Sequence, residues 1–250
     1  NLELVKHSLD DIINKHADVS YQISTAIQIH GISLLEEFQK YLKMGYFPTS
    51  TSINNKDIFF KTIRQAIDRT IESDLLATYP SLSGVSVGKM KKLITIISKS
   101  GPFVPDYAKL KSALDLSSET TIKDYFFYLH KADIIRLLSK SKENIGNMRK
   151  PEKIYFDNPN YLTAVAPEES ANLGTLRETF VFMAIDNYFT MNGIESGGVF
   201  ASISGDFETV HGQTFEVGGK SKSFKQIAKV EKSYVIADDI LYGEGRKIPM

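Results

Sequence analysis

The sequence contains no cysteine and no tryptophan, and its formal charge is zero because 30 Lys and Arg residues balance 30 Asp and Glu residues. The lack of cysteine excludes disulfide bridges, thiolate nucleophiles and thiolate metal sites, and it fits a reducing compartment, so we predict a cytoplasmic protein. No apolar run approaches the ~18 residues that a membrane span needs, so we expect no membrane partner. At zero formal charge, any basic surface must be local.

The chain of 250 residues is 42% hydrophobic and 24% charged, which is typical of a globular protein with one large domain or two to three small ones. Charge and periodicity divide it into three segments. We predict a multi-domain α/β protein with a helical subdomain over 1–80, a winged helix-turn-helix over 81–165 and a mixed α/β domain over 166–250.

Residues 1–80 show the spacing of amphipathic helices throughout. Apolar residues recur every three or four positions before Gly31, over 34–42 and over 56–76. This spacing predicts two helices before Gly31 and one helix in each later range. No alternating pattern typical of a strand interrupts them.

The positive charge is concentrated in residues 81–150, which hold 13 Lys and Arg against 6 Asp and Glu, a net of +7. Residues 1–80 hold 8 against 10, a net of −2, and residues 151–250 hold 9 against 14, a net of −5. Within the basic segment, three stretches of helical spacing precede two strand-like runs, ADIIRLLSK and KPEKIYFDNPN. Three helices, the last two joined by a tight turn, followed by a two-stranded ribbon are the order of a winged helix-turn-helix.

The third of these helices is where such a domain would contact nucleic acid. Its N-terminal residues reach base edges in the major groove, while Lys and Arg around it neutralise phosphates. The alternative is a protein-binding domain whose lysines are only solvated, and Glu119 on the predicted reading face counts against close phosphate contact. The residues that we predict at the groove are Ser118, Thr120, Thr121, Lys123 and Tyr125.

The third segment combines a helix that begins at Asn172 with short β-like runs separated by glycine. SFKQIAKV, between the last two runs, has a helical pattern.

Carboxylates at the ends of these strands are the clearest chemical feature. Asp206 begins one predicted strand and Glu216 ends the next, so a hairpin or an adjacent strand pair would bring both to one place. Two carboxylates can hold Mg²⁺, which prefers oxygen ligands, and the ion could activate water for phosphodiester cleavage. Glu178 is a candidate third acid, and Lys220 is a candidate for stabilising developing charge. The alternative is that these acids are solvated or paired with the lysines that this segment offers, Lys220, Lys222 and Lys225.

Two stretches look like phosphate-binding loops but lack the required spacing. SGVSVGKMKK has only three residues between Gly84 and Gly88, and FEVGGKSK has Thr214 where the leading glycine should stand. Neither fits GxxxxGK[ST], so we predict that this chain does not bind ATP.

Seven strings in order resemble the C-terminal two-thirds of bacterial AAA-type ATPases that carry a C-terminal domain of unknown function. The resemblance covers nearly the whole chain and implies that an AAA core, which binds ATP and Mg²⁺, precedes this region. The absence of Met at position 1 and the apolar KIPM at the end agree with a piece of a longer protein. The strings are FQKYLKMGYFP, AIDRTIESDL, KPEKIYFDNPN, NLGTLRETFVF, GDF, FEVGGKSKSFKQI and KIP.

The C-terminal domain of these ATPases is similar to the restriction-endonuclease-like fold, whose nucleases use Asp and then Glu-x-Lys on neighbouring strands. On this resemblance Asp206 matches the aspartate and Glu216 the glutamate, but Gly218 stands where the lysine belongs. Lys220, four residues beyond Glu216, reaches the site only through a turn, and Glu178 matches an auxiliary acid. The resemblance therefore implies a retained fold with altered chemistry.

The favoured prediction is a partner- or nucleic-acid-binding region of an AAA-type ATPase, itself not catalytic and with an inactive nuclease-like site. One alternative is a Mg²⁺-dependent nuclease that uses Asp206, Glu216 and a displaced Lys220, and another is a module for protein interaction or oligomerisation. The expected partners are DNA or RNA, or a protein. No cofactor is expected in this chain except Mg²⁺ at the nuclease-like site.

Overall fold

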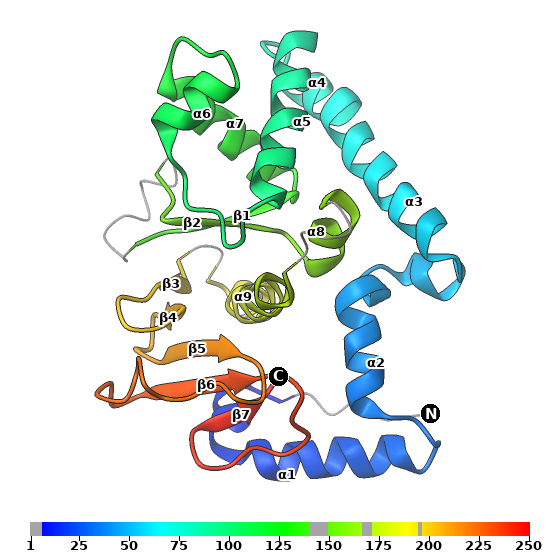
Figure 1. Ribbon diagram of the computed structural model, residues 1–250, viewed down its shortest axis with the longest axis vertical. Coiled ribbons are helices and arrows are strands. Elements are labelled where there is room, and N and C mark those ends of the chain that lie inside the picture. The colour runs from blue at the N-terminus through cyan, green and yellow to red at the C-terminus, as the bar shows by residue number, and fades with distance from the viewer. Residues whose placement is uncertain (1–6, 141–149, 167–171, 195–196) are drawn as a thin grey trace.

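The computed structural model describes residues 7–140, 150–166, 172–194 and 197–250, and it confirms a mixed α/β protein (Figure 1). The helices are α1 (Leu9–Gln28), α2 (Leu34–Lys40), α3 (Lys56–Arg69), α4 (Leu75–Thr78), α5 (Gly84–Ser98), α6 (Tyr107–Ala113), α7 (Glu119–Lys131), α8 (Pro159–Val165) and α9 (Leu173–Met191). The strands are β1 (Ile135–Leu138), β2 (Lys153–Phe156), β3 (Val199–Ala201), β4 (Phe207–Thr209), β5 (Thr214–Gly218), β6 (Ser233–Ala237) and β7 (Lys247–Pro249).

The N-terminal helices follow their sequence signals, with one difference. Ser8 caps α1 through a capping box with Asp11. The two helices expected before Gly31 are present within α1, but they meet directly at a kink where the backbone of Lys15 is non-helical, without an intervening loop. A π-helical turn over Tyr41–Gly45 ends α2, and Gly45 is required there because a Cβ atom would lie 2.7 Å from the Tyr41 ring.

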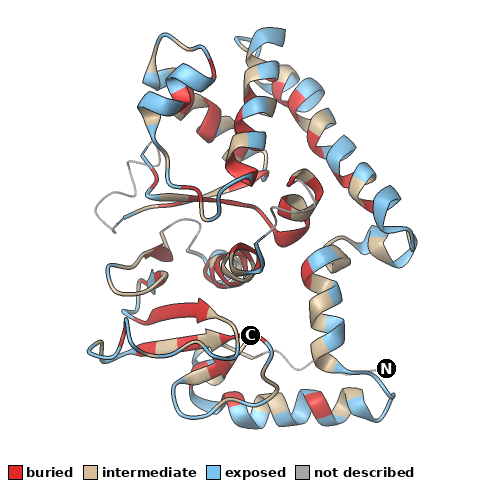
Figure 2. Cartoon of the chain, viewed as in Figure 1, coloured by how far each residue is buried: buried red, intermediate tan, exposed pale blue. Residues whose placement is uncertain are grey.

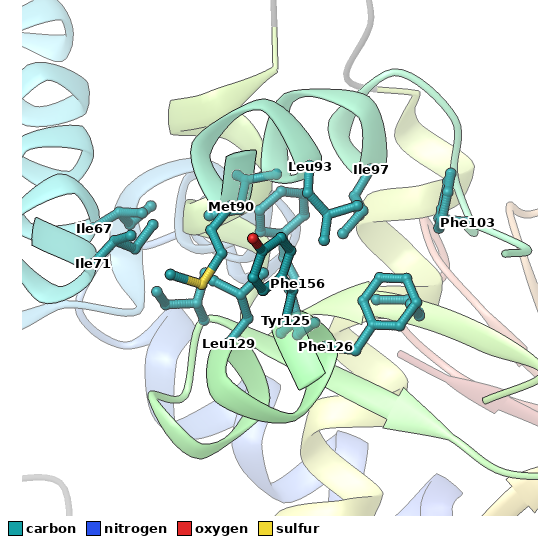
Figure 3. Close-up of a cluster of buried hydrophobic side chains, with 14 of the residues drawn as sticks. Ile67, Ile71, Met90, Leu93, Ile97, Phe103, Tyr125, Phe126, Leu129 and Phe156 are labelled. Atoms are coloured by element: carbon teal, nitrogen blue, oxygen red, sulfur yellow. The ribbon is translucent and has the colours of Figure 1, made fainter. Parts of the chain in front are cut away.

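An upper core lies between α3, α5, α7 and the β1–β2 hairpin. Apolar side chains from these elements interdigitate, and Tyr125 and Phe156 lie among them (Figure 3). Helix α3 continues through a π-helical turn over Thr70–Asp74 into α4. The largest fully buried side chains of this core are Phe59, Ile71, Met90, Leu93, Leu114, Ile122 and Phe126.

The basic segment contains the elements predicted for it, in the predicted order. Helices α5, α6 and α7 precede the antiparallel hairpin, in which Arg136 pairs with Tyr155. Ser118 caps α7 by accepting a hydrogen bond from the Thr120 amide. Phe103, between α5 and α6, adds an antiparallel bridge to Ile154 of β2.

Helix α9 lies between the hairpin and the five-stranded sheet (Figure 1). Its Phe182 ring lies 5.3 Å from the Tyr155 ring of β2 and stacks at 5.6 Å on Phe207 of β4, between ring centroids. This lower core buries α9 and β5, while α1 packs on β7 and stays largely exposed (Figure 2). Its buried members include Ile13, Val181, Phe182, Ile185, Phe189, Val199, Phe207, Phe215, Val217 and Ile248.

The five-stranded sheet has the order β3-β4-β5-β6-β7. Strands β3, β4 and β5 pair antiparallel, whereas β5, β6 and β7 pair parallel. The connection from β5 to β6 was expected to include a helix over SFKQIAKV, but it consists of turns. The Ile227 and Val230 amides there bond to carbonyl oxygens three residues earlier, instead of four residues earlier as in an α-helix. The Ser233 hydroxyl lies 2.7 Å from the Val230 carbonyl oxygen and 3.0 Å from that of Ile227, and its one proton can be donated to either.

Polar contacts join the upper and lower parts. Arg136 of β1 pairs with Asp157 at 2.9 Å and with Asp186 of α9 at 2.6 Å, and it also donates to Asn187 at 2.9 Å. The Ala201 amide of β3 donates to the Ser139 carbonyl oxygen at 2.8 Å. Buried side chains of segment 1–80 enter both cores. No helix of the described residues combines the length and apolar character of a membrane span.

Candidate active site

Asp206 and Glu216 meet at the start of β4 and on β5, as the sequence predicts. The Val217 amide donates to the Asp206 carboxylate at 2.7 Å, and the Asp206 amide donates to the Phe215 carbonyl oxygen at 2.9 Å. Asp206 is therefore held against the residues on either side of Glu216. Because side chains alternate along a strand, Glu216 points away from Phe215 and Val217, which enter the lower core.

Glu178 of α9 belongs to the same cluster. Burial raises its pKa to about 7, and the Asp206 charge adds to this, while the Tyr155 hydrogen bond and the Lys153 and Lys222 charges oppose it. The Tyr155 hydroxyl of β2 donates to the Glu178 carboxylate at 2.9 Å. A carboxyl group with this pKa can exchange a proton near neutral pH.

Glu216 is the most buried acid of the cluster, with 1% of its surface exposed. One of its carboxylate oxygens forms an ion pair with Lys222, whereas the other, Oε2, has no hydrogen-bond partner among the described residues. Burial raises the Glu216 pKa, against the Lys222 hydrogen bond. A buried carboxylate oxygen without a partner has a high energetic cost, which a bound cation would remove.

The lysine of the cluster is Lys222 and not Lys220, so the sequence-based assignment of Lys220 is wrong. Lys220 is exposed, and its carbonyl oxygen accepts a hydrogen bond from Lys247. The Lys222 stem lies against Gly218, where an added Cβ atom would be 2.6 Å from the Lys222 Cδ atom. The turn after β5, with a 2.9 Å bond from the Lys222 amide to the Gly219 carbonyl, thus returns a lysine to the space above Gly218.

A metal ion could be held by only part of this cluster. No three His, Cys, Asp or Glu residues in the described ranges form a group arranged to bind a metal. The oxygen donors that fit are Asp206 and Glu216, because they are held together by β4 and β5 and because Glu216 Oε2 has no partner within the part of the chain that the structure describes. Mg²⁺ suits such a pair, since it commonly uses one or two carboxylates and keeps several waters.

The residues predicted to contact nucleic acid lie at the start of α7, with one exception. Thr120 is exposed, Ser118, Thr121 and Lys123 are half-buried, and Lys123 lies 5.7 Å from the centre of the Tyr107 ring. Tyr125 is only 4% exposed and lies in the upper core (Figure 3), so its assignment to the groove is wrong. Spacings of three and four residues place Tyr125 on the same buried stripe as Ile122, Phe126 and Leu129.

The sequence analysis missed Lys153 and Tyr155 of the cluster, and it considered Lys222 only as one of three lysines that could pair with the acids, which its ion pair with Glu216 confirms for Lys222. Lys153 and Tyr155 alternate with apolar residues in KIYF of β2, which indicates a shared strand face but not what that face contacts. The sequence could not distinguish Lys222 from Lys220 and Lys225, because turns carry no periodicity that fixes where a side chain points.

No curated protein and no solved structure matches this chain. The model of a domain of unknown function matches residues 35–171, more than half of the chain. The matched range includes the hairpin with Lys153 and Tyr155 but ends before Glu178, Asp206, Glu216 and Lys222. The chain belongs to the family described as domain of unknown function DUF8612.

Proposed function

We propose that this chain binds DNA and cleaves it with a divalent cation at the Glu178, Asp206, Glu216 and Lys222 cluster. The observation that carries the proposal is the position of Lys222. Its ammonium group reaches Glu216 from beyond the turn, above the strand position where Gly218 replaces a lysine. The cluster therefore holds the two acids and the lysine of a nuclease-like site, although their order along the chain departs from Glu-x-Lys.

Each side chain has a role that follows from its surroundings. Asp206 and Glu216 would hold Mg²⁺, which when bound polarises a phosphate oxygen and activates water. Lys222 places a positive charge beside them, where it can stabilise the charge that develops on the phosphate. Glu178, whose pKa is raised to about 7 by burial, can accept or release a proton near neutral pH.

DNA is the favoured substrate because of the elements above the cluster. Three helices followed by a hairpin support a winged helix-turn-helix, and residues 81–150 carry the net charge of +7 counted above. The start of α7 exposes Thr120, with Ser118, Thr121 and Lys123 beside it. An α-helix fits the major groove of B-form DNA but not the deep, narrow major groove of A-form RNA.

A second candidate function is a binding region of an AAA-type ATPase that does not cleave its ligand. It is favoured by the ion pair between Glu216 and Lys222 and by the hydrogen bond from Tyr155 to Glu178. These contacts already give the Glu216 and Glu178 carboxylates partners within the protein when no substrate is bound. In this case DNA or a protein partner would regulate ATP hydrolysis by the parent protein.

The test is cleavage of single-stranded, duplex and branched DNA in Mg²⁺ or Mn²⁺ by the wild-type chain and its variants. We expect D206N and K222A to lose about 100-fold or more in rate, as is usual when a charge-stabilising group is removed. K220A is the matched control, because Lys220 is exposed nearby and should retain activity within about threefold.

A variant with a lysine at position 218 of strand β5 tests more sharply whether the position of the ammonium group determines the rate. In the double variant G218K/K222G, which also removes the Lys222 Cβ atom that would lie 2.8 Å from a Cβ atom at position 218, the ammonium group would approach Glu216 from strand β5, and we expect recovery of at least part of the rate lost in K222G. Absence of cleavage by the wild-type chain on all substrates would reject the nuclease. DNA-stimulated ATP hydrolysis by the parent protein, without cleavage, would instead support the binding region, and a stable assembly without DNA affinity would support a protein-interaction module.

A further inference from the structure

Strand β2 of the hairpin faces the candidate active site from the side opposite β5. Its Tyr155 donates to Glu178 at 2.9 Å, and the Tyr155 ring centre lies 5.8 Å from that of Phe207. Lys153 is two residues earlier on the same strand, so it shares the face of Tyr155. Lys153 is half-buried, so its stem is packed while its ammonium group can reach solvent.

The charge of Lys153 is directed at the acids of the cluster. Burial raises the pKa of both Glu178 and Glu216, and Lys153 is among the cations that oppose this increase in each case. Lys222 forms an ion pair with Glu216. By contrast, Lys153 forms no ion pair with any other residue in the described ranges. A half-buried cation thus lies near two carboxylates, Glu178 and Glu216, without forming an ion pair with either in the described part of the chain.

The hairpin is fixed relative to the cluster. Arg136 pairs with Asp186 of α9 at 2.6 Å and with Asp157 at 2.9 Å, on the strand that pairs with β2. The amide of Ala201 binds the Ser139 carbonyl at the end of β1. The position of Lys153 is therefore set by the same contacts that join the upper and lower cores.

We infer that Lys153 is a substrate-binding residue that contacts a phosphate of the DNA backbone at the candidate active site. This inference rests on the proposed function and deepens it. Three acids repel a phosphodiester, so a DNA strand can enter the cluster only where cations offset them, and a lysine binds phosphate as a compact point charge. The hairpin and the sheet then form one continuous DNA-binding surface instead of two independent sites.

The experiment measures binding of a fluorescently labelled duplex DNA to the full chain in EDTA, across a series of salt concentrations. We expect K153A to weaken binding about tenfold and to reduce the slope of log affinity against log salt by about one, since one phosphate contact is lost. K61A removes an exposed lysine of α3, outside the basic segment, and is the control, with an expected loss of less than about threefold. K153R keeps the charge and should bind nearly as the wild type does.

Equal losses in K153A and K61A would overturn the inference, as would a wild-type chain that does not bind duplex DNA at low salt. Thermal unfolding identifies any variant that fails to fold, and K153R then reports on the charge alone. Binding that depends on Lys153 without cleavage in Mg²⁺ or Mn²⁺ would reject the nuclease and keep the inference. Cleavage with a KM that K153A does not change would keep the nuclease and reject the inference.

Discussion

The upper and lower cores bury different chemistry. The polar side chains buried in the elements of the upper core, Ser98, Asn158 and Asn160, form hydrogen bonds with the backbone. The sheet region below it buries acids, hydroxyls and amides, including Glu216 with an unpartnered oxygen. Burial of apolar surface stabilises a fold, whereas burial of an unsatisfied polar group costs free energy. The difference indicates that the upper core mainly stabilises the protein and that the lower region keeps costly groups for binding or chemistry.

The largest expected effect compares two neighbouring phenylalanines of helix α7, one buried in the upper core and one partly exposed. Phe126 of α7 is fully buried, whereas its neighbour Phe127 is 38% exposed. We expect F126A to reduce the free energy of unfolding by about 3–5 kcal/mol, because it leaves a cavity in a packed core. F127A should change it by no more than about 0.5 kcal/mol. Urea denaturation measures both, and similar losses in the two variants would contradict a dry, tightly packed upper core.

A second effect concerns the junction between the cores. Arg136 has a largely buried side chain that pairs with Asp157 and Asp186. We expect R136A to cost about 3 kcal/mol, because two buried acids lose their cation, and to split unfolding into two transitions. K91A, which removes a more exposed pairing with Asp68 and Glu72, should cost less than about 1 kcal/mol. A single transition of nearly wild-type stability for R136A would show that the cores are joined by other contacts.

A smaller effect tests whether the cluster costs stability. Glu178 has a pKa raised from 4.5 to about 7 by burial, so the folded state holds its proton more tightly than the unfolded state. The stability of the wild type should therefore fall as pH rises from 4.5 towards 7 and then level off. E178Q lacks this ionisation and should be more stable than the wild type by on the order of 2 kcal/mol at pH 8, with little difference at pH 4.

Urea denaturation in EDTA at several pH values makes this comparison. E208Q, which changes an exposed glutamate of β4, is the control and should follow the wild type at every pH. If the difference between E178Q and the wild type were independent of pH, the raised pKa of Glu178 would be wrong.

Much of the fold followed from local pattern. Spacings of three and four residues located α2, α3, α5, α7 and α9, and alternating or continuous apolar runs located the hairpin and β3 to β6. These patterns reflect which side of an element is buried, and they hold wherever that side packs. SFKQIAKV had the same helical spacing and still formed turns, in which the Ile227 and Val230 amides bond to carbonyls three residues earlier, because apolar spacing records which side is buried and not which backbone bonds form.

The candidate site was predictable only in part. Strand positions brought Asp206 and Glu216 together, and the helix placed Glu178 near them. Tyr125 was misassigned because the reading face of α7 was chosen by position from its N-terminus and not by its buried stripe. The remaining members, Lys153, Tyr155 and Lys222, come from a distant strand and from a turn.

The sequence by itself determined the periodic elements, the basic character of the middle segment and the two carboxylates on adjoining strands. These properties depend on residue order and on short-range geometry. Only the tertiary structure decided which lysine reaches Glu216 and which strand faces Glu178. Both depend on the path of turns and on packing between segments far apart in the chain, where no local periodicity fixes the direction of a side chain.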